Sequence, residues 1–304
     1  MRAIQMSGYG GPEVLQLGDA PTPEPARGEV RIRTAAIGVN PADWKWRAGW
    51  FQAVVQFSFP HILGYDLAGV VDALGPGVAD LAVGDRVVSM TSSSKQGAYA
   101  EYVAVAAADT ARIPANLDFA TAAALPTPGL TGVQLVEEFL QPHGGQTVLV
   151  TGAVGGVGRF SMHAAKRLGA GIVAAVRASQ VDEAKSLGAD EVIVLGAEAW
   201  SGSPFDAVAD TVGGPDVAKL CRHLKPGGKI GTVATTPIAK DGLSTEPVFF
   251  AYHADKARLG ELAEEVASGA LIVPVAKRLP LAAAAEAQRL MEAGGQGGKI
   301  VLEP

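Results

Sequence analysis

The stretch "TVLVTGAVGGVGRF", residues 147–160, decides the fold of this chain. It joins a short apolar run, a turn rich in glycine and the beginning of a helical pattern. The spacing Ala153-x-Gly155-x-x-Gly158 is that of the dinucleotide-binding fingerprint, with alanine at the position of the first glycine. Apolar residues then recur at helical intervals: Val157, Phe160, Ala164, Ala165 and Leu168. A strand, a glycine turn and a helix in this order predict a βαβ unit that binds a nucleotide.

The glycines of this turn have separate roles in such a site. Gly155 lets the backbone approach a pyrophosphate, and Gly158 lets the helix pack closely against the strand. The helix N-terminus offers free N–H groups and the positive end of a dipole to the phosphates. The residues expected to line this phosphate site are Gly152, Ala153, Gly155, Gly156, Val157 and Gly158.

The end of the next predicted strand indicates which dinucleotide binds. In "IVAAVRASQ", residues 172–180, Arg177 stands where an NAD site usually carries Asp or Glu on the ribose hydroxyls, and Ser179 follows it. An acid would repel a 2′-phosphate, whereas a guanidinium can bind it through two hydrogen bonds. The alternative is that Arg177 is an ordinary solvated arginine. The position favours NADPH over NADH.

The rest of the sequence shows two different patterns of expected secondary structure. From 147 to about 236, strands alternate with helical segments, which is typical of a parallel sheet. These strands are expected at Thr147–Val150, Ile172–Val176, Glu191–Val194, Asp206–Asp210 and Lys229–Ala234. Residues 1 to about 125 instead form short strand-like runs separated by Gly and Pro turns, which is typical of a sandwich or partial barrel. A further helix is expected near 254–268.

Composition excludes several classes of protein. The 304 residues suit two domains or one large one, with 48% hydrophobic and 18% charged residues. A net charge of −6 without a basic stripe argues against nucleic-acid binding. The sequence has no apolar run long enough to span a membrane, and its start lacks the apolar region of a secretory signal. The single cysteine, Cys221, fits a reducing cytoplasm, and we expect it to be inert packing.

A series of motifs resembles the medium-chain dehydrogenase/reductase superfamily, in its zinc-free quinone reductase branch. The motifs are "GVNPADWKWRAG" (38–49), "LGYDLAGVV" (63–71), "VGDRV" (83–87), "GAYAEYV" (97–103), "GLTG" (129–132), "TGAVGGVG" (151–158), "SLGADEVI" (186–193), "DTVGG" (210–214) and "GGKIVL" (297–302). The resemblance implies an α/β protein with a GroES-like β domain over residues 1–122 and 270–304. A Rossmann-like parallel-sheet domain would occupy residues 123–269. The resemblance also implies a homodimer.

Departures from the superfamily pattern bear on the chemistry. Its alcohol dehydrogenases carry a Gly-His-Glu segment whose histidine binds catalytic zinc, and the matching segment here is Gly64-Tyr65-Asp66. Their first zinc cysteine falls on Asn40, and their cysteine-rich lobe has no counterpart in this sequence. The nearby His61 alone cannot make a site, so we expect no metal. Without a Lewis acid, the favoured substrates are those whose anion spreads over a conjugated system, namely quinones and α,β-unsaturated carbonyls.

Three residues are candidates for catalysis, and each has a structural alternative. Asn40 matches an asparagine near the nicotinamide in relatives, and its amide could donate to an enolate or cap a turn before Pro41. Lys45 matches a lysine of related alkenone reductases and could stabilise or protonate the enolate, or lie exposed. Tyr65 stands where zinc would have been, and could donate to the substrate or fill the space. Asp43 could orient Lys45 or hold the loop.

Further residues are expected on the cofactor side. Thr131 follows the "GLT" pattern that relatives place near the nicotinamide. Lys299, in the last predicted strand, could reach the cofactor or lie at a strand edge. Backbone groups at the ends of two parallel strands could hold ribose and carboxamide. They belong to Thr211 and Val212 in one strand, and to Val233, Ala234 and Thr235 in the other.

An aromatic group lies close to the candidate catalytic residues in the sequence. It consists of Trp44, Trp46, Trp50, Phe51, Phe57 and Phe59. These rings could form a flat slot for a quinone or a local core.

The sequence therefore predicts zinc-independent, NADPH-dependent hydride transfer to a quinone or an α,β-unsaturated carbonyl. One alternative is an NADPH-binding sensor or structural relative with little turnover. Another is an enoyl-thioester reductase, although the segment 236–250 offers only Lys240 as a basic contact for a carrier.

Overall fold

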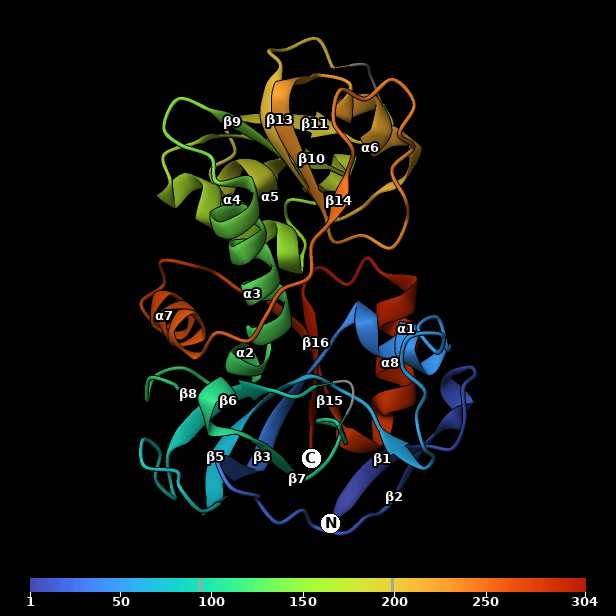
Figure 1. Ribbon diagram of the computed structural model, residues 1–304, viewed down its shortest axis with the longest axis vertical. Coiled ribbons are helices and arrows are strands. Elements are labelled where there is room, and N and C mark those ends of the chain that lie inside the picture. Colours follow the sequence, from blue (N-terminus) through green and yellow to red (C-terminus); the bar gives the residue numbers. More distant parts are fainter. Residues whose placement is uncertain (93–94, 198–199) are drawn as a thin grey trace. The chain divides into compact units, whose positions relative to one another are not determined.

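The computed structural model describes residues 1–92, 95–197 and 200–304, and the chain divides into two compact units. Unit 1 consists of Met1–Thr127 and Ala254–Pro304, and unit 2 of Pro128–His253 (Figure 1). Each unit has its own hydrophobic core. Within the described ranges, no helix is long and apolar enough to cross a membrane.

Unit 1 is built on a seven-stranded sheet and a smaller three-stranded sheet (Figure 1). The large sheet has the order β15 (Val275–Pro280), β16 (Lys299–Glu303), β3 (Glu29–Val39), β5 (Asp66–Leu74), β6 (Arg86–Met90) and β8 (Ala111–Arg112), and β7 (Tyr102–Ala106) also pairs with β3. The small sheet has the order β2 (Leu15–Asp19), β1 (Arg2–Met6) and β4 (His61–Ile62). The helices are α1 (Pro41–Arg47), α2 (Phe119–Ala123), α7 (Lys256–Ala267) and α8 (Ala284–Ala293), with 3-10 turns at Pro12–Val14, Ala107–Asp109 and Leu281–Ala283.

Strand β3 is central to unit 1 and determines where the polar residues that follow it lie. Its residues alternate between buried and less buried from Glu29 to Thr34, as expected for a strand with one face on the core. The burial becomes continuous from Ala36 to Val39. A side chain at Gly38 would overlap the carbonyl of Ala123, so glycine permits α2 to approach the strand closely.

Unit 2 is a doubly wound parallel sheet. Its strands lie in the order β11 (Glu191–Val194), β10 (Gly171–Val176), β9 (Thr147–Thr151), β12 (Phe205–Asp210), β13 (Leu224–Thr232) and β14 (Val248–Phe249), and every neighbouring pair is parallel. Its helices are α4 (Gly156–Arg167), α5 (Val181–Ser186) and α6 (Gly214–Cys221), with a 3-10 turn at Ala178–Gln180. Helix α3 (Pro126–Gln134) leads into a π-helix at Leu135–Leu140.

The strand order of unit 2 reverses between β9 and β12. The chain runs outward from β9 through β10 to β11, and then returns to β12 on the other side of β9. Open parallel sheets bind ligands at the carboxyl ends of their strands beside such a reversal. All five expected strands are present, and β13 differs most, because it begins at Leu224 rather than Lys229. The fold class predicted from the sequence is confirmed.

The division into units differs in position from the expected domain boundaries. It falls after residues 127 and 253, whereas the family resemblance implied domain boundaries after residues 122 and 269. The helix expected near 254–268 is present as α7, but its contacts are with unit 1. Lys256 at its start forms an ion pair with Asp80, and the carbonyl of Ala267 at its end accepts a 3.0 Å hydrogen bond from Asn116.

Candidate functional site

A buried polar cluster forms in unit 1 at the beginnings of β5, β16 and α1. Asp66, the first residue of β5, is fully buried. Its Oδ1 accepts hydrogen bonds from the Thr127 N–H at 3.0 Å and from the Thr127 hydroxyl at 2.6 Å. Its Oδ2 accepts a third from Asn40 Nδ2 at 2.8 Å. These bonds engage both carboxyl oxygens and hold Asp66 in one orientation.

Lys299 brings a cation to this cluster from the first position of β16. Its Nζ donates to Oδ1 of Asn40 and lies 3.5 Å from Oδ2 of Asp66. The antiparallel pairing of β16 with β3 sets Ile300 opposite Val39, which brings Lys299 close to Asn40. The structure thus joins two predicted site residues to which the sequence had assigned different roles, Asn40 in catalysis and Lys299 on the cofactor side.

Asp43 supports the cluster from the first turn of α1. It is fully buried, and its Oδ2 accepts hydrogen bonds from the Asn40 N–H at 2.8 Å and from the Tyr99 hydroxyl at 2.9 Å. Its Oδ1 has no partner among the described residues. Burial raises the pKa of Asp43 to about 7, because the ionised carboxylate loses its hydration, and the two hydrogen bonds offset this only in part. Asp43 therefore holds the loop, which is one of its two expected roles.

Burial also moves the pKa of the other charged groups in the cluster. Desolvation raises the pKa of Asp66 above its usual range and lowers the pKa of the Lys299 ammonium. The two charges oppose these shifts, because Lys299 favours the ionised form of Asp66 and Asp66 favours the ammonium. Asp43 acts on Lys299 in the same direction as Asp66 does.

The other expected catalytic residues of unit 1 have different surroundings. Lys45 Nζ lies 5.6 Å from the ring centroid of Trp44 and 5.8 Å from that of Trp50, where an ammonium is attracted to an aromatic face. Its partial burial lowers the pKa of Lys45. Tyr65 is partly exposed, and its carbonyl accepts a 2.8 Å hydrogen bond from the Thr91 N–H.

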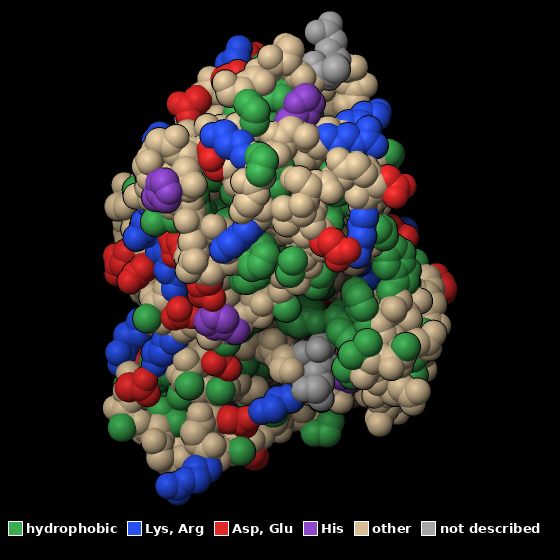
Figure 2. Space-filling model, turned by 45° about the horizontal axis from the view of Figure 1, so that its top comes forward, with side chains coloured by type: hydrophobic (Ala, Val, Ile, Leu, Met, Phe, Trp, Pro, Cys, Tyr) green, Lys and Arg blue, Asp and Glu red, His purple; other side chains and the backbone are tan. Residues whose placement is uncertain are grey.

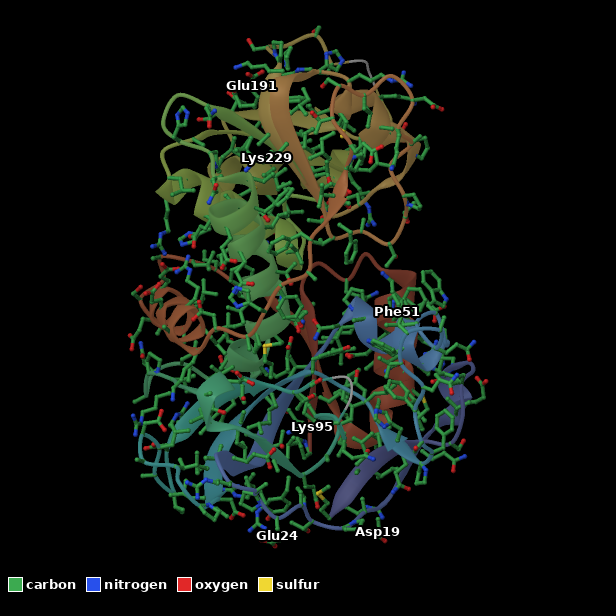
Figure 3. The ribbon with its side chains drawn as sticks, in the orientation of Figure 1. Asp19, Glu24, Phe51, Lys95, Glu191 and Lys229 are labelled. Atoms are coloured by element: carbon green, nitrogen blue, oxygen red, sulfur yellow. The ribbon has the colours of Figure 1, made fainter. Side chains whose placement is uncertain are left out.

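The aromatic residues divide into two groups. Trp44 and Trp50 meet edge to face with centroids 5.0 Å apart, and 56% of Trp50 is exposed. Trp46 packs with Phe51 at 4.8 Å and with Phe57 at 5.3 Å, and Phe51 lies in the turn after α1 (Figure 3). The first group leaves an open aromatic surface, whereas the second forms local core.

His61 is a packed residue. Its ring stacks on that of Phe57 with centroids 3.9 Å apart, and burial lowers the pKa of His61 to about 4, so the imidazole is neutral at pH 7. Phe59, the remaining aromatic of the expected group, meets Tyr9 edge to face at 5.2 Å. Among the residues that the structure describes, no group of three or more His, Cys, Asp or Glu side chains is arranged to hold a metal ion.

In unit 2 the glycine turn between β9 and α4 has the geometry of a phosphate site. Gly152 has a φ of +61°, and a side chain at Gly158 would overlap the backbone of Gly152 and Ala153, so the helix begins close against the turn. Over the described part of the chain, the N–H groups of Gly156, Val157 and Gly158 have no protein acceptor. Three such donors at a helix N-terminus fit the phosphates of a dinucleotide.

Asp210 connects the strand ends beside this turn. The hydroxyl of Thr151, which ends β9, donates to its Oδ1 at 2.6 Å, and the hydroxyl of Thr232, which ends β13, donates to its Oδ2 at 2.6 Å. The N–H groups of Val212 and Gly213 also donate to Oδ1, at 3.0 and 2.9 Å. One carboxylate therefore ties three neighbouring strands together at their carboxyl ends.

These contacts affect the backbone groups expected to hold the cofactor. The N–H groups of Thr211, Val212, Val233 and Ala234 all donate within the protein, to Thr151, Asp210, Asp210 and Thr232 in turn. They are thus not available as donors to a ligand. Thr235, the last of the group, is partly exposed.

Three predicted residues of unit 2 remain, namely Arg177, Ser179 and Thr131. Arg177 and Ser179 are exposed directly after β10, and Thr131 is buried on α3. A side chain at the neighbouring Gly132 would collide with α4 at the carbonyl of Val157, so this glycine lets the two helices touch. Cys221 is buried, and burial raises its pKa to about 12, which agrees with inert packing.

Three supporting residues were missed by sequence reasoning. Tyr99 and Asp210 lie in motifs that the sequence singled out, but their partners are 56 and 59 residues away. Arg47 is 2% exposed and ties α1 to α8 by donating to Gln288 and Glu292, both at 3.1 Å. No pattern in a single sequence indicates that an arginine close to several tryptophans is buried.

The chain is similar to known proteins over its full length. The family model described as alcohol dehydrogenase GroES-like domain matches residues 26–115, and the one described as zinc-binding dehydrogenase matches residues 187–302. A chloroplast envelope quinone oxidoreductase homolog of Arabidopsis thaliana is 31% identical over all of this chain and 98% of its own length. An NADPH-dependent alkenal/one oxidoreductase of the same plant is 34% identical, covering all of this chain and 80% of its own. The quinone oxidoreductase of Coxiella burnetii superposes with a TM-score of 0.92 at 30% identity, covering 100% and 99% of the two chains.

A glycine turn for a dinucleotide, a doubly wound sheet and a GroES-like unit together define a nucleotide-dependent oxidoreductase. More particularly, the chain belongs to the medium-chain dehydrogenase/reductase family, in its quinone oxidoreductase branch. The resemblance inferred from the sequence motifs is confirmed.

Proposed function

We propose that this protein is an NADPH-dependent reductase of quinones or α,β-unsaturated carbonyls that works without zinc. The observation that carries the proposal is the start of α4, where three successive N–H groups without a protein acceptor follow a glycine turn. Relatives over the full length of the chain include quinone and alkenal/one oxidoreductases, which supports the substrate class.

The residues of unit 2 fit a dinucleotide. Gly156, Val157 and Gly158 would hold the phosphates, and the rigid strand ends around Asp210 would line the nicotinamide side. Arg177 is exposed after β10, at the position where an NAD site usually carries Asp or Glu. It supports NADPH as the dinucleotide, because a guanidinium can bind a 2′-phosphate. When bound, the reduced nicotinamide supplies the hydride.

The residues of unit 1 supply donors for the anion that hydride addition creates. One N–H of the Asn40 amide is held by Asp66, and its oxygen accepts from Lys299. The other N–H can donate to a developing oxyanion. Lys45 and Tyr65 are the further candidates to contact the substrate, and the aromatic surface of Trp44 and Trp50 suits a flat, conjugated ring.

The positions that match the zinc ligands of alcohol dehydrogenases support the zinc-free assignment. They hold the amide of Asn40 and the phenol of Tyr65, and neither is a ligand that zinc prefers. The substrate we propose is a small molecule rather than a nucleic acid. In Figure 2, basic and acidic side chains are interspersed over the face that is shown, which supports this.

The test is oxidation of NADPH followed by stopped flow, with NADH in parallel. The acceptors are 1,4-benzoquinone, 9,10-phenanthrenequinone, an alkyl vinyl ketone, 2-hexenal and crotonyl-CoA. We expect turnover of quinones or enones with NADPH and weaker turnover with NADH. Tight NADPH binding with no turnover of any acceptor would instead identify a sensor, and turnover of crotonyl-CoA alone would identify an enoyl-thioester reductase.

We also propose that the protein is a homodimer joined through β14. This strand is the edge of the parallel sheet, and Val248 and Phe249 on it are 46% and 62% exposed. An edge with unpaired backbone groups and apolar side chains can pair with the same edge of a second copy about a twofold axis. Light scattering after size exclusion should give a dimer for the unaltered chain and a monomer for F249K, and a monomeric unaltered chain would contradict the proposal.

A further inference from the structure

Lys299 is a buried, hydrogen-bonded lysine rather than a solvated one at the surface. Its side chain is 9% exposed, whereas lysine side chains are ordinarily solvated. Two of its three N–H bonds point to acceptors, Oδ1 of Asn40 and Oδ2 of Asp66. Among the described residues, Nζ has no third acceptor, so one hydrogen remains to be donated.

The charges around Lys299 favour its protonated form, whereas its burial makes the proton easier to lose. The acidic groups that act on it are Asp66 from β5 and Asp43 from α1, and the phenol of Tyr99 donates to Asp43. Both carboxyls favour the ammonium. Burial works against it and lowers the pKa of Lys299, which brings the group closer to the range in which general acids operate.

We propose that Lys299 is the proton donor of the reaction, a role that rests on the proposed reductase function. Addition of a hydride to the substrate moves an electron pair to the carbonyl or quinone oxygen. An N–H bond of Lys299 then breaks as an O–H bond forms on that oxygen, which leaves a neutral amine. Water returns the proton to Nζ, and Asp66 holds the restored ammonium in place.

The experiment compares three variants with the unaltered chain on the acceptor that it turns over best. K299A removes the donor, whereas K299R keeps the positive charge but cannot release a proton near neutral pH. The matched control is K277R, at an exposed lysine on the neighbouring strand β15. We expect kcat to fall about 10²–10⁴-fold in both K299A and K299R, the usual contribution of general acid catalysis, and to stay unchanged in K277R.

Three further readouts separate proton donation from a structural or cofactor-binding role. The kcat of the unaltered chain should fall on the alkaline side as Lys299 loses its proton, and D66N should move this limb to lower pH, because the charge of Asp66 favours the ammonium. Methylammonium should restore part of the activity of K299A. The dissociation constant of NADPH should change less than about threefold, a difference of under ~1 kcal/mol.

An active K299R with the pH profile of the unaltered chain would overturn the proposal, since charge alone would then suffice. A K299A variant whose loss in kcat is matched by an equal loss in NADPH affinity would make Lys299 a cofactor ligand and would also overturn it. If the variants do not fold, the profile of the unaltered chain decides, because a kcat without an alkaline limb excludes a lysine donor. An unaltered chain that turns over no acceptor would overturn the proposed function as well.

Discussion

The hydroxyl of Tyr99 donates a 2.9 Å hydrogen bond to Oδ2 of Asp43, and both side chains are fully buried. The same oxygen accepts the Asn40 N–H, so a single carboxyl oxygen connects the loop of Tyr99 to the start of α1. This arrangement holds the backbone of Asn40, whose side-chain oxygen accepts a hydrogen bond from Lys299.

Y99F should destabilise the protein without removing a reacting group. Loss of the hydroxyl leaves Asp43 with one fewer donor, and the expected decrease in the free energy of unfolding is about 1–3 kcal/mol. Urea denaturation measures it. Y102F is the matched control, because Tyr102 on β7 is partly exposed. Equal stability of Y99F and Y102F would contradict the role assigned to this bond.

The stability of the protein should depend on pH through Asp43. Its pKa is about 7 in the folded chain and 3.8 when unperturbed, so the unfolded chain gives up this proton first. The protonated carboxyl therefore contributes stability that is complete below about pH 4 and is lost as the pH rises through about 7.

D43N removes this titration. Between pH 4 and pH 8, unfolding free energies from urea should show the unaltered chain losing stability relative to D43N, on the order of 4 kcal/mol at most. D182N changes the same charge at an exposed site and should follow the unaltered chain. Parallel curves for all three proteins would show that Asp43 does not ionise in this range.

G158A should damage the phosphate site. The added methyl group would overlap the backbone of Gly152 and Ala153, so α4 must move away from the turn. We expect a loss of about 1–3 kcal/mol in stability, as for other overpacked sites, and a weaker affinity for NADPH by calorimetry. In the control G144A, the nearest atom to the new methyl group is 3.8 Å away. NADPH affinity equal in the two variants would count against the site.

R177A should change the choice of dinucleotide. A charge-assisted hydrogen bond is worth about 1.5–3 kcal/mol, so the KM for NADPH should rise roughly 10–100-fold while that for NADH stays within about twofold. Steady-state kinetics with both nucleotides measures this. R27A, at an exposed arginine of unit 1, controls for a general loss of positive charge. A similar change in KM for both nucleotides would show that Arg177 does not contact the 2′-phosphate and is an ordinary solvated arginine.

The parts of the fold that depend on local pattern could be predicted from the sequence. Strands β9 to β12 lie within one residue of their expected ends, because each is a short apolar run between turn signals. Strand β13 begins five residues earlier than expected, since its first half, with Pro226 and two glycines, has no strand pattern. Helix α7 was expected at nearly its observed position, but no local signal indicates which unit a helix packs against.

The candidate site was predictable only in part, because its contacts join distant segments. Asn40 and Lys299 were both singled out by motif, yet 259 residues separate them, and no single sequence reports such a pairing. Buried partners such as Tyr99 were recognisable only as members of a motif. The sequence also contained no sign that the N–H groups of Val212 and Ala234 donate within the protein.

Unit 2 is one continuous segment, whereas unit 1 is interrupted by it. During synthesis, the nucleotide-binding sheet is therefore complete before the ribosome has made β15 or β16. Chain elongation at about 5–20 residues per second leaves an interval of roughly 2–10 s between His253 and Lys299. Over that interval Asp66 and Asn40 lack their cation and β3 lacks the neighbour that β16 provides. The candidate phosphate turn of unit 2 is thus synthesised before Lys299, the last residue to join the polar cluster of Asn40 and Asp66.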